Sequence, residues 1–236
     1  MELHLRCLYH HDENDRIVRT RQPNGWPAPL FHLARTRLGS LWRFRDDLEP
    51  GVIRGLARLA GREEPLQEGH PLPQRLQAMR ALLRSSADLV VERRGPVYRF
   101  PVEIPGDDPR GIPVVAVTSR NQALLEDSFA DTIPELEGRQ PCFAAVDGVR
   151  AVSLCYSARP LEVAGGETCA ASEAGVETLV AYRREGLGAR VVAAWARQVR
   201  ELGAEPMYST EWGNEPSQAV ARKLGLILYG EDLSFS

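Results

Sequence analysis

Apolar residues change their period around Gly175–Gly188, the stretch that organises the later part of the chain. A largely buried strand is indicated by β-branched and apolar residues: Val176, Thr178, Leu179 and Val180. The helix expected over Ala189–Leu202 carries its apolar residues on one face: Val191, Trp195, Val199 and Leu202. The sequence therefore predicts a strand, a turn that contains Gly186 and Gly188, and a helix, in that order.

The rest of the second half alternates in the same way. Strands are expected over Val114–Thr118, Cys142–Val146, Val149–Cys155, Met207–Thr210, Leu226–Tyr229 and Leu233–Phe235. Asp147-Gly148 is a strong hairpin signal. Helices are expected over Asn121–Phe129 and from Pro216 to Gly225.

The first half is less regular. Met1–Pro50 shows short strand-like runs between turn clusters, and no helix is expected there. Helices are expected over Gly51–Leu59 and Pro73–Leu83, and strands over Ala87–Glu92 and Val97–Val102, on either side of a turn at Arg93–Pro96. Ile104–Pro113 is rich in proline, glycine and charge and reads as a linker. We therefore expect a smaller N-terminal α+β domain over 1–111 and a second domain over 112–236.

A hairpin is expected around Gly39-Ser40, and its register decides what the nearby arginines do. A three-residue loop would put Arg35, Arg37, Arg43 and Arg45 on one face and Trp42 and Phe44 on the other. A two-residue loop would mix them. The first arrangement could bind an anion or form a solvated face, and both interpretations stay open.

Composition narrows the class of protein. The 236 residues are 43% hydrophobic, and their net charge of −3 lacks the basic excess of a nucleic-acid binder. No apolar run is long enough to span a bilayer, and the charged N-terminus does not resemble a secretory signal, so we expect a cytoplasmic protein. The four cysteines lie far apart, which favours reduced thiols and predicts neither a disulfide framework nor a metal site.

The turn before the second-half helix is suited to a phosphate group. A helix N-terminus leaves backbone N–H groups without intrahelical partners and carries roughly half a positive charge. Glycine at 186 and 188 would let a ligand approach the backbone closely.

Two segments together resemble the GNAT acetyltransferases. Arg183-Arg184-Glu185-Gly186-Leu187-Gly188 fits their R/Q-x-x-G-x-G/A turn. Asn214-x-x-Ser217, followed by Lys223-Leu224-Gly225-Leu226, is similar to their later N-x-x-A/S segment ending in KLGF. The resemblance covers roughly residues 112–236. It implies a mixed α/β domain with a splayed central sheet that binds acetyl-CoA, with no metal.

The resemblance also implies roles for individual residues. Val176, Glu177 and Thr178 match strand positions that hold the acetyl and pantetheine portion. The amides around the pyrophosphate match Arg183, Arg184, Glu185, Gly186, Leu187, Gly188 and Ala189. Asn214 and Ser217 match residues near the pantetheine arm.

The implied chemistry is direct transfer of an acetyl group from the thioester to an amine. An amine with a pKa near ~10 is only about a thousandth deprotonated at pH 7, so a carboxylate base is needed. Glu173 and Glu177 would point to the same side of a regular strand, and either is a candidate base. Relatives commonly have a proton-donating tyrosine where this chain has Ala221, so Tyr229, Ser217 or water would have to protonate the thiolate.

Other interpretations of the glycine turn remain. It could belong to a dinucleotide-binding fold, with Glu205 near the expected acidic position, or be only a tight structural turn. Two functions are also open: an acetyltransferase acting on a small amine or a protein amino group, and a catalytically weak acyl-CoA-binding regulatory module. The acceptor and the oligomeric state are not encoded in any recognisable pattern.

Overall fold

The computed structural model describes residues 1–22, 28–84, 91–106, 111–161 and 170–236. The chain forms two compact units, each built from separate stretches of sequence. The first contains Met1–Val97, Thr210–Asn214 and Leu228–Ser236, and the second contains Tyr98–Ser209 and Glu215–Ile227. The expected boundary after residue 111 assumed two continuous domains, and that assignment stays a prediction.

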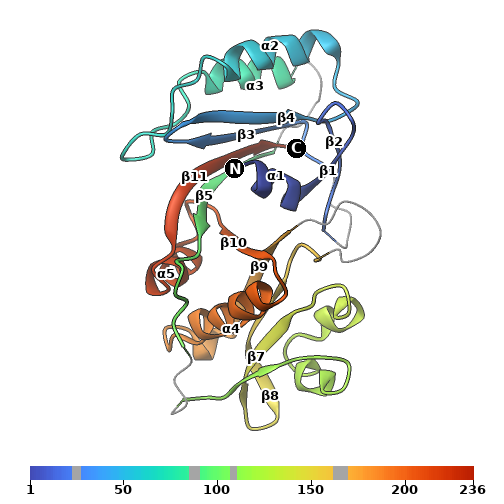
Figure 1. The fold of residues 1–236 in the computed structure, drawn as a ribbon, viewed down its shortest axis with the longest axis vertical. Helices are drawn as coiled ribbons and strands as arrows, with labels where there is room; N and C mark the ends of the chain where they lie inside the picture. Colours follow the sequence, from blue (N-terminus) through green and yellow to red (C-terminus); the bar gives the residue numbers. More distant parts are fainter. Residues whose placement is uncertain (23–27, 85–90, 107–110, 162–169) are drawn as a thin grey trace. The chain divides into compact units, whose positions relative to one another are not determined.

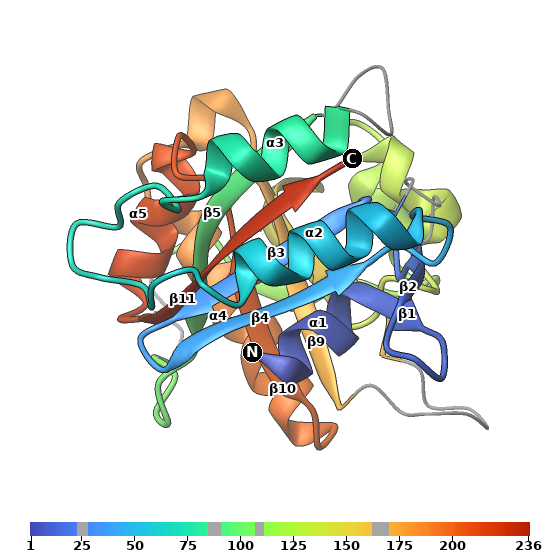
Figure 2. The same ribbon diagram turned by 90° about the horizontal axis from the view of Figure 1, so that it is seen from above.

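The first unit is a sheet with helices on both faces (Figures 1 and 2). Its main strands lie in the order β4-β3-β11-β5, and β1 and β2 form a separate pair. The elements are α1 (Glu2–Leu8), β1 (Tyr9–His11), β2 (Ile17–Thr20), β3 (Phe31–Thr36), β4 (Gly39–Phe44), α2 (Pro50–Ala60), α3 (Leu76–Arg84), β5 (Glu92–Arg99) and β11 (Ile227–Phe235). Helices α2 and α3 cover one face, as predicted from their apolar spacing, and α1 lies on the other.

Helix α1 corrects the expectation that Met1–Pro50 contains no helix. Its residues Leu5 and Leu8 are buried in a small cluster that also contains Ala34 of β3. A helix of seven residues is too short to show a helical period in the sequence. Packing against the sheet therefore supplies the stability that an isolated turn of helix lacks.

The β3–β4 hairpin has the two-residue loop, because Thr36 pairs with Gly39. Arg35 therefore shares a face with Trp42, while Arg43 pairs with His32 and lies on the opposite face. Both arginines are buried, and each has a carboxylate partner. The arrangement in which all the arginines line one face is excluded.

Strand β5 runs through Arg93–Pro96, where the sequence predicted a turn. Glycine and proline usually interrupt strands, but here they allow a close approach of another segment. The carbonyl of Thr210 occupies the place where a Cβ on Gly95 would lie, and the Thr210 N–H donates to Pro96 O. The last two expected strands are likewise one continuous strand, β11.

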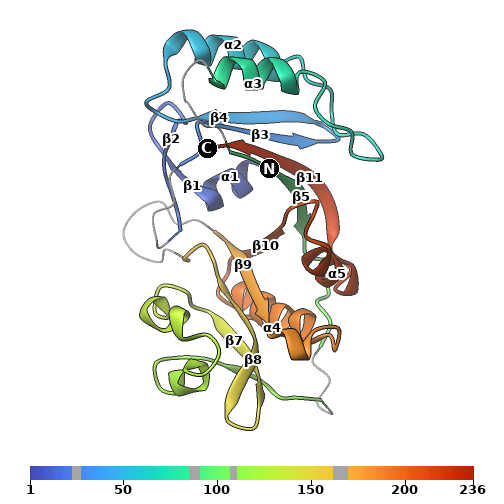
Figure 3. The same cartoon turned by 180° about the vertical axis from the view of Figure 1, so that it is seen from behind.

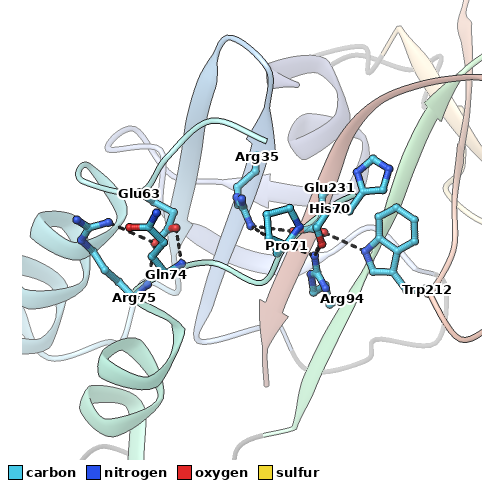
Figure 4. A network of polar contacts seen from close by, with 9 residues as sticks. All are labelled: Arg35, Glu63, His70, Pro71, Gln74, Arg75, Arg94, Trp212 and Glu231. Atoms are coloured by element: carbon cyan, nitrogen blue, oxygen red, sulfur yellow. Dashed lines mark hydrogen bonds and ion pairs between the residues drawn. The ribbon is translucent and has the colours of Figure 1, made fainter. Parts of the chain in front are cut away.

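A buried carboxylate joins four segments of the first unit (Figure 4). Glu231 is fully buried and accepts from Arg35 Nη1 at 3.3 Å, from Trp212 Nε1 at 2.9 Å and from Arg94. Both arginines also donate to the carbonyl of Pro71. These contacts fix the 210–214 segment and the loop that precedes α3.

A second buried carboxylate lies on the α1 face of the same sheet. Asp232 accepts from His4 Nε2 at 2.5 Å and from His32 Nε2 at 3.1 Å, and Tyr9 Oη lies 2.9 Å from His32 Nδ1. Burial alone would raise the pKa of Asp232, but the two histidines and their hydrogen bonds outweigh it and hold the pKa well below its usual range.

We expect Asp232→Asn to lower the free energy of unfolding by ~3 to 5 kcal/mol at neutral pH, because it leaves buried histidines without their carboxylate. A lowered folded-state pKa contributes stability above the unfolded value, ~3.9, and that contribution is lost as the pH falls below it. Urea unfolding at several pH values should therefore show a steeper acid loss for the parent chain than for the variant. Equal acid slopes would contradict this role.

The second unit is a sheet in the order β10-β9-β8-β7-β6. Its elements are β6 (Val114–Ala116), the 3₁₀ turns η1 (Gln122–Leu125), η2 (Ala130–Glu135) and η3 (Val180–Tyr182), β7 (Cys142–Asp147), β8 (Arg150–Ser157), β9 (Ala171–Thr178), α4 (Leu187–Glu201), β10 (Glu205–Ser209) and α5 (Glu215–Lys223). Helix α4 packs on one face (Figure 3), and η1 and η2 cover the other.

Most elements of this unit agree with the sequence prediction. The β7–β8 hairpin is present, with Asp147 paired to Arg150. The helix expected over Asn121–Phe129 is wrong, because η1 and η2 are two short 3₁₀ segments. Leu125 and Phe129 are nevertheless buried, so the apolar spacing identified a core-facing segment but not its conformation.

Candidate functional site

Strand β9 is paired with different neighbours along its length. It runs parallel to β10 over Ala171–Glu173 and antiparallel to β8 over Ala174–Thr178. The register with β10 ends where Glu173 faces Met207, although both strands continue. The two strands therefore diverge from this point, which is the splayed sheet that the sequence led us to expect.

The backbone of β9 beyond Glu173 presents its groups alternately to its two edges. Glu173 O accepts from Ala158 N, so odd-numbered residues face β8. Ala170 O accepts from Glu205 N, so even-numbered residues face β10. Ala174, Val176 and Thr178 consequently direct their backbone groups into the divergence.

This alternation changes the predicted set of backbone groups. Val176 and Thr178 direct their backbone groups into the divergence, although Thr178 O also accepts from Arg183 Nε at 3.2 Å. The backbone of Glu177 faces β8 instead, and its carbonyl accepts from Ser153 Oγ at 3.1 Å. Ala174 has its backbone directed into the divergence, which only the strand register could identify.

The turn that follows leads into α4 with a left-handed backbone at two positions. Arg184 has φ 70° and Gly186 has φ 84°. Helix α4 begins at Leu187, and Arg190 N donates to Gly186 O. The preceding amides, those of Leu187, Gly188 and Ala189, lie in the first helical turn, where N–H groups have no intrahelical acceptor. Such N–H groups, at the positive end of a helix, suit an anion.

The two glycines of the turn have different roles. A Cβ on Gly186 would collide with the ammonium of Lys223, which reaches this turn from α5. A Cβ on Gly188 would lie 3.4 Å from both Thr178 Oγ1 and Val220 Cγ2. Gly188 is buried and lets α4 pack closely on β9 and α5, and the approach of a ligand to its backbone stays a prediction.

Glu173 and Glu177 lie on the same face of β9, away from α4, as predicted. Glu173 is 7% exposed, and its Oε1 accepts from Ser209 Oγ at 2.5 Å. Its Oε2 lies 3.6 Å from Arg159 Nη2. Neither partner could be identified from the sequence, because one lies on β10 and the other follows β8.

Glu177 is exposed and accepts from the hydroxyl of Tyr156 at 3.2 Å. The Tyr156 ring lies across Gly175, where an added Cβ would come within 2.5 Å of Cε2. Burial, then the negative charge of Glu177, raises the pKa of Tyr156. Glu177 therefore contacts a protonated phenol.

Ser217 lies in the first turn of α5, with its Oγ 2.7 Å from the hydroxyl of Tyr208. Tyr208 is buried, which raises its pKa well above the usual range, so it stays protonated. Ala221 lies one turn further on and is part of the same buried cluster. The tyrosine hydroxyl near this face of α5 thus comes from β10.

The remaining predicted residues belong to the first unit. Asn214 directly precedes α5, and its N–H donates to Glu211 O at 3.0 Å. Tyr229 lies in β11. Their proposed contacts with the pantetheine and the thiolate stay predictions.

Comparison with known proteins agrees with this geometry. Residues 172–234 match the family described as FR47-like protein, which spans β9 to β11. A GCN5-related N-acetyltransferase-like protein from Streptococcus suis is similar in structure, with a TM-score of 0.50, 15% identity, and coverage of 89% of this chain and 85% of that one. The chain has the GNAT fold.

Two further structures illustrate how far the likeness extends. A GNAT-family acetyltransferase from Colwellia psychrerythraea has a TM-score of 0.50 and 9% identity, with 83% of this chain and 75% of that chain covered. A GNAT-family protein from Novosphingobium aromaticivorans has a TM-score of 0.47 and 16% identity, with 62% and 66% covered. No curated protein matches the sequence.

The three described cysteines are buried thiols. Cys7, Cys142 and Cys155 are buried and unbonded to each other, and burial raises the pKa of Cys142 to about 12. In the parts of the chain that the structure describes, we find no cluster of three metal-ligating side chains and no helix suited to crossing a membrane.

We expect Gly186→Ala to cost ~1 to 2 kcal/mol of stability, because an alanine is strained at φ 84°. Gly203→Ala is the matched control, since Gly203 has φ 79° and open space around its Cβ position. Unfolding measurements should show similar losses for both variants. Only Gly186→Ala, which displaces Lys223, should also weaken acetyl-CoA binding, and equal affinities would contradict a ligand site at this turn.

Proposed function

We propose that this chain is an N-acetyltransferase that moves an acetyl group from acetyl-CoA to an amine by direct transfer. One observation carries the proposal: the edge of β9 beyond Glu173 leads into a left-handed turn and the N-terminus of α4. Pantetheine contains two amides that a strand edge can bind as an added strand would. The diphosphate next to it matches the anion site at the helix.

Lys223 strengthens the anion site. Its ammonium lies beside Gly186, at the N-terminus of α4. The positive charge of the lysine and the partial positive charge of the helix end would repel each other there. A bound diphosphate would be attracted both to the Lys223 ammonium and to the N-terminus of α4. The helix contributes only ~0.3 to 2 kcal/mol, so the aligned N–H donors and the lysine supply the remaining attraction.

The proposed orientation of acetyl-CoA along β9 favours one of the two candidate bases, Glu173 and Glu177. With the diphosphate at α4, after the C-terminal end of β9, the thioester lies toward the start of the divergence, beside Ala174. Glu173 is next to that point, whereas Glu177 is four residues further along, ~13 Å away on a strand. Glu173 is therefore the proposed base.

Each step can be assigned to a group of this chain or its substrates. Glu173 accepts a proton from the acceptor amine, whose nitrogen forms a bond to the thioester carbonyl carbon. The carbon–sulfur bond breaks, and the thiolate leaves with the bonding electrons. Ser217, whose Oγ lies 2.7 Å from the Tyr208 hydroxyl, is our proposed hydrogen-bond donor to the thiolate, with Tyr229 or water as the alternatives.

A catalytically weak acyl-CoA-binding module is the second candidate. Two observations favour it: Glu173 is already bound by Ser209 and lies near Arg159, and Ala221 replaces the expected tyrosine. A thiolate leaving group has a pKa near ~8.5, so a missing acid does not by itself prevent transfer.

Binding is tested by thermal unfolding with acetyl-CoA, which should stabilise the chain by ~2.7 kcal/mol at 100 times the dissociation constant. Lys223→Met should weaken binding about threefold to tenfold by removing a charge at the diphosphate. Arg222→Met is the control, because this neighbouring exposed arginine is paired with Glu215. The absence of any shift for the parent chain would overturn the proposal.

Catalysis is tested by free-thiol release over a panel of amines. Glu173→Gln should lower kcat by ~100-fold to 10,000-fold, because a general base is lost, and should leave acetyl-CoA binding intact. Glu177→Gln, on the same face of the strand, should change kcat little. A larger loss in Glu177→Gln would assign the base to the other carboxylate, and no turnover despite tight binding would favour the regulatory module.

A further inference from the structure

Arg159 lies beside the proposed base and has hydrogen-bonding capacity left over. Its Nη1 donates to Ala158 O at 3.2 Å, and its Nη2 lies 3.6 Å from Glu173 Oε2. Its Nε is buried and has no hydrogen-bond partner among the residues that the structure describes. Ser172 Oγ donates to Arg159 O at 2.8 Å, which holds the residue at the end of β8.

Glu173 does not satisfy this guanidinium. A separation of 3.6 Å is longer than a hydrogen bond, and the other carboxylate oxygen is already bound by Ser209. The Nε and Nη2 groups of an arginine form a planar fork that fits a carboxylate with two parallel hydrogen bonds. Arg159 therefore keeps the edge that would bind a second carboxylate.

A second arginine on this face of the sheet is engaged differently. Arg139 donates to Glu135, four residues earlier, and its guanidinium lies 4.3 Å from the centre of the Tyr156 ring. Arg139 thus has the same charge as Arg159 on the same side of the sheet but different partners. Comparing variants of the two arginines therefore distinguishes a specific ion pair with Arg159 from a general attraction to positive charge on this face.

We infer that the acceptor is an α-amino acid, whose amine faces Glu173 and whose carboxylate binds Arg159. The inference rests on the proposed acetyl transfer. The amine and the carboxylate of such a molecule are attached to the same carbon atom, so they match two protein groups of opposite charge that lie side by side. The acceptor's amine then lies next to the Glu173 carboxylate, and its carboxylate lies next to the Arg159 guanidinium, so opposite charges are neighbours.

The carboxylate takes no part in the bond changes. The amine nitrogen bonds to the acetyl carbon, its proton goes to Glu173, and the carbon–sulfur bond breaks with the electrons on sulfur. Arg159 supplies orientation, because it holds the acceptor with its amine at the base. An acceptor without the carboxylate would lack this contact in both the bound and the reacting state.

The test compares three forms of each acceptor: the common amino acids, their amides, and the amines left after decarboxylation. For at least one side chain, the amino acid should have a kcat/KM ~10-fold to 100-fold above its amide and its decarboxylated amine. Arg159→Met should remove this difference, so that within this variant the amino acid and its amide have equal kcat/KM. Arg159→Lys should recover part of it, and Arg139→Met should keep it.

Acetyl-CoA binding, measured by thermal unfolding, checks that each variant is folded and distinguishes the two possible failures. If acetyl-CoA binds and amides or simple amines are acetylated as well as the amino acids, the inference is overturned and the proposed function stands. Transfer to no amino acid overturns it as well. If acetyl-CoA does not bind the parent chain, the proposed function fails, and the inference fails with it.

Discussion

The candidate site depends on one constraint: β9 cannot stay paired with both neighbours along its whole length. After Glu173 the strand keeps its ladder with β8 and leaves the register of β10. Backbone amides and carbonyls that would be paired in a continuous sheet are then directed into the divergence between β9 and β10. Because Ala174 and Val176 offer backbone groups, this part of the site depends on strand position more than on side-chain identity.

The first unit shows a different principle, in which buried charges fix loops. Glu231 is matched by two arginines, so the cluster carries an excess positive charge inside a largely apolar layer. Such a cluster is costly to desolvate and tolerates few alternative arrangements. The segment that carries Trp212 and ends at Asn214 is therefore held in one conformation immediately before α5 begins.

Sequence analysis predicted the regular elements and missed those that tertiary contacts create. Helices α2, α4 and α5 are long enough to show their period, whereas α1 has seven residues and Gly95-Pro96 mimics a turn. At the site, the glycine turn was recognisable because its residues are contiguous. Arg159 and Ser209 were not, because strand pairing brings them to Glu173 from distant parts of the chain.

The position of β11 has a consequence for how the protein is made. This strand lies between β3 and β5 in the order of the sheet, yet it comes after the entire second unit in the sequence. Emerging from the ribosome, Met1–Val97 would have an incomplete sheet with two unpaired strand edges. Met1–Val97 is therefore made before the strand that completes its sheet, and this sheet cannot be completed until β11 has been synthesised.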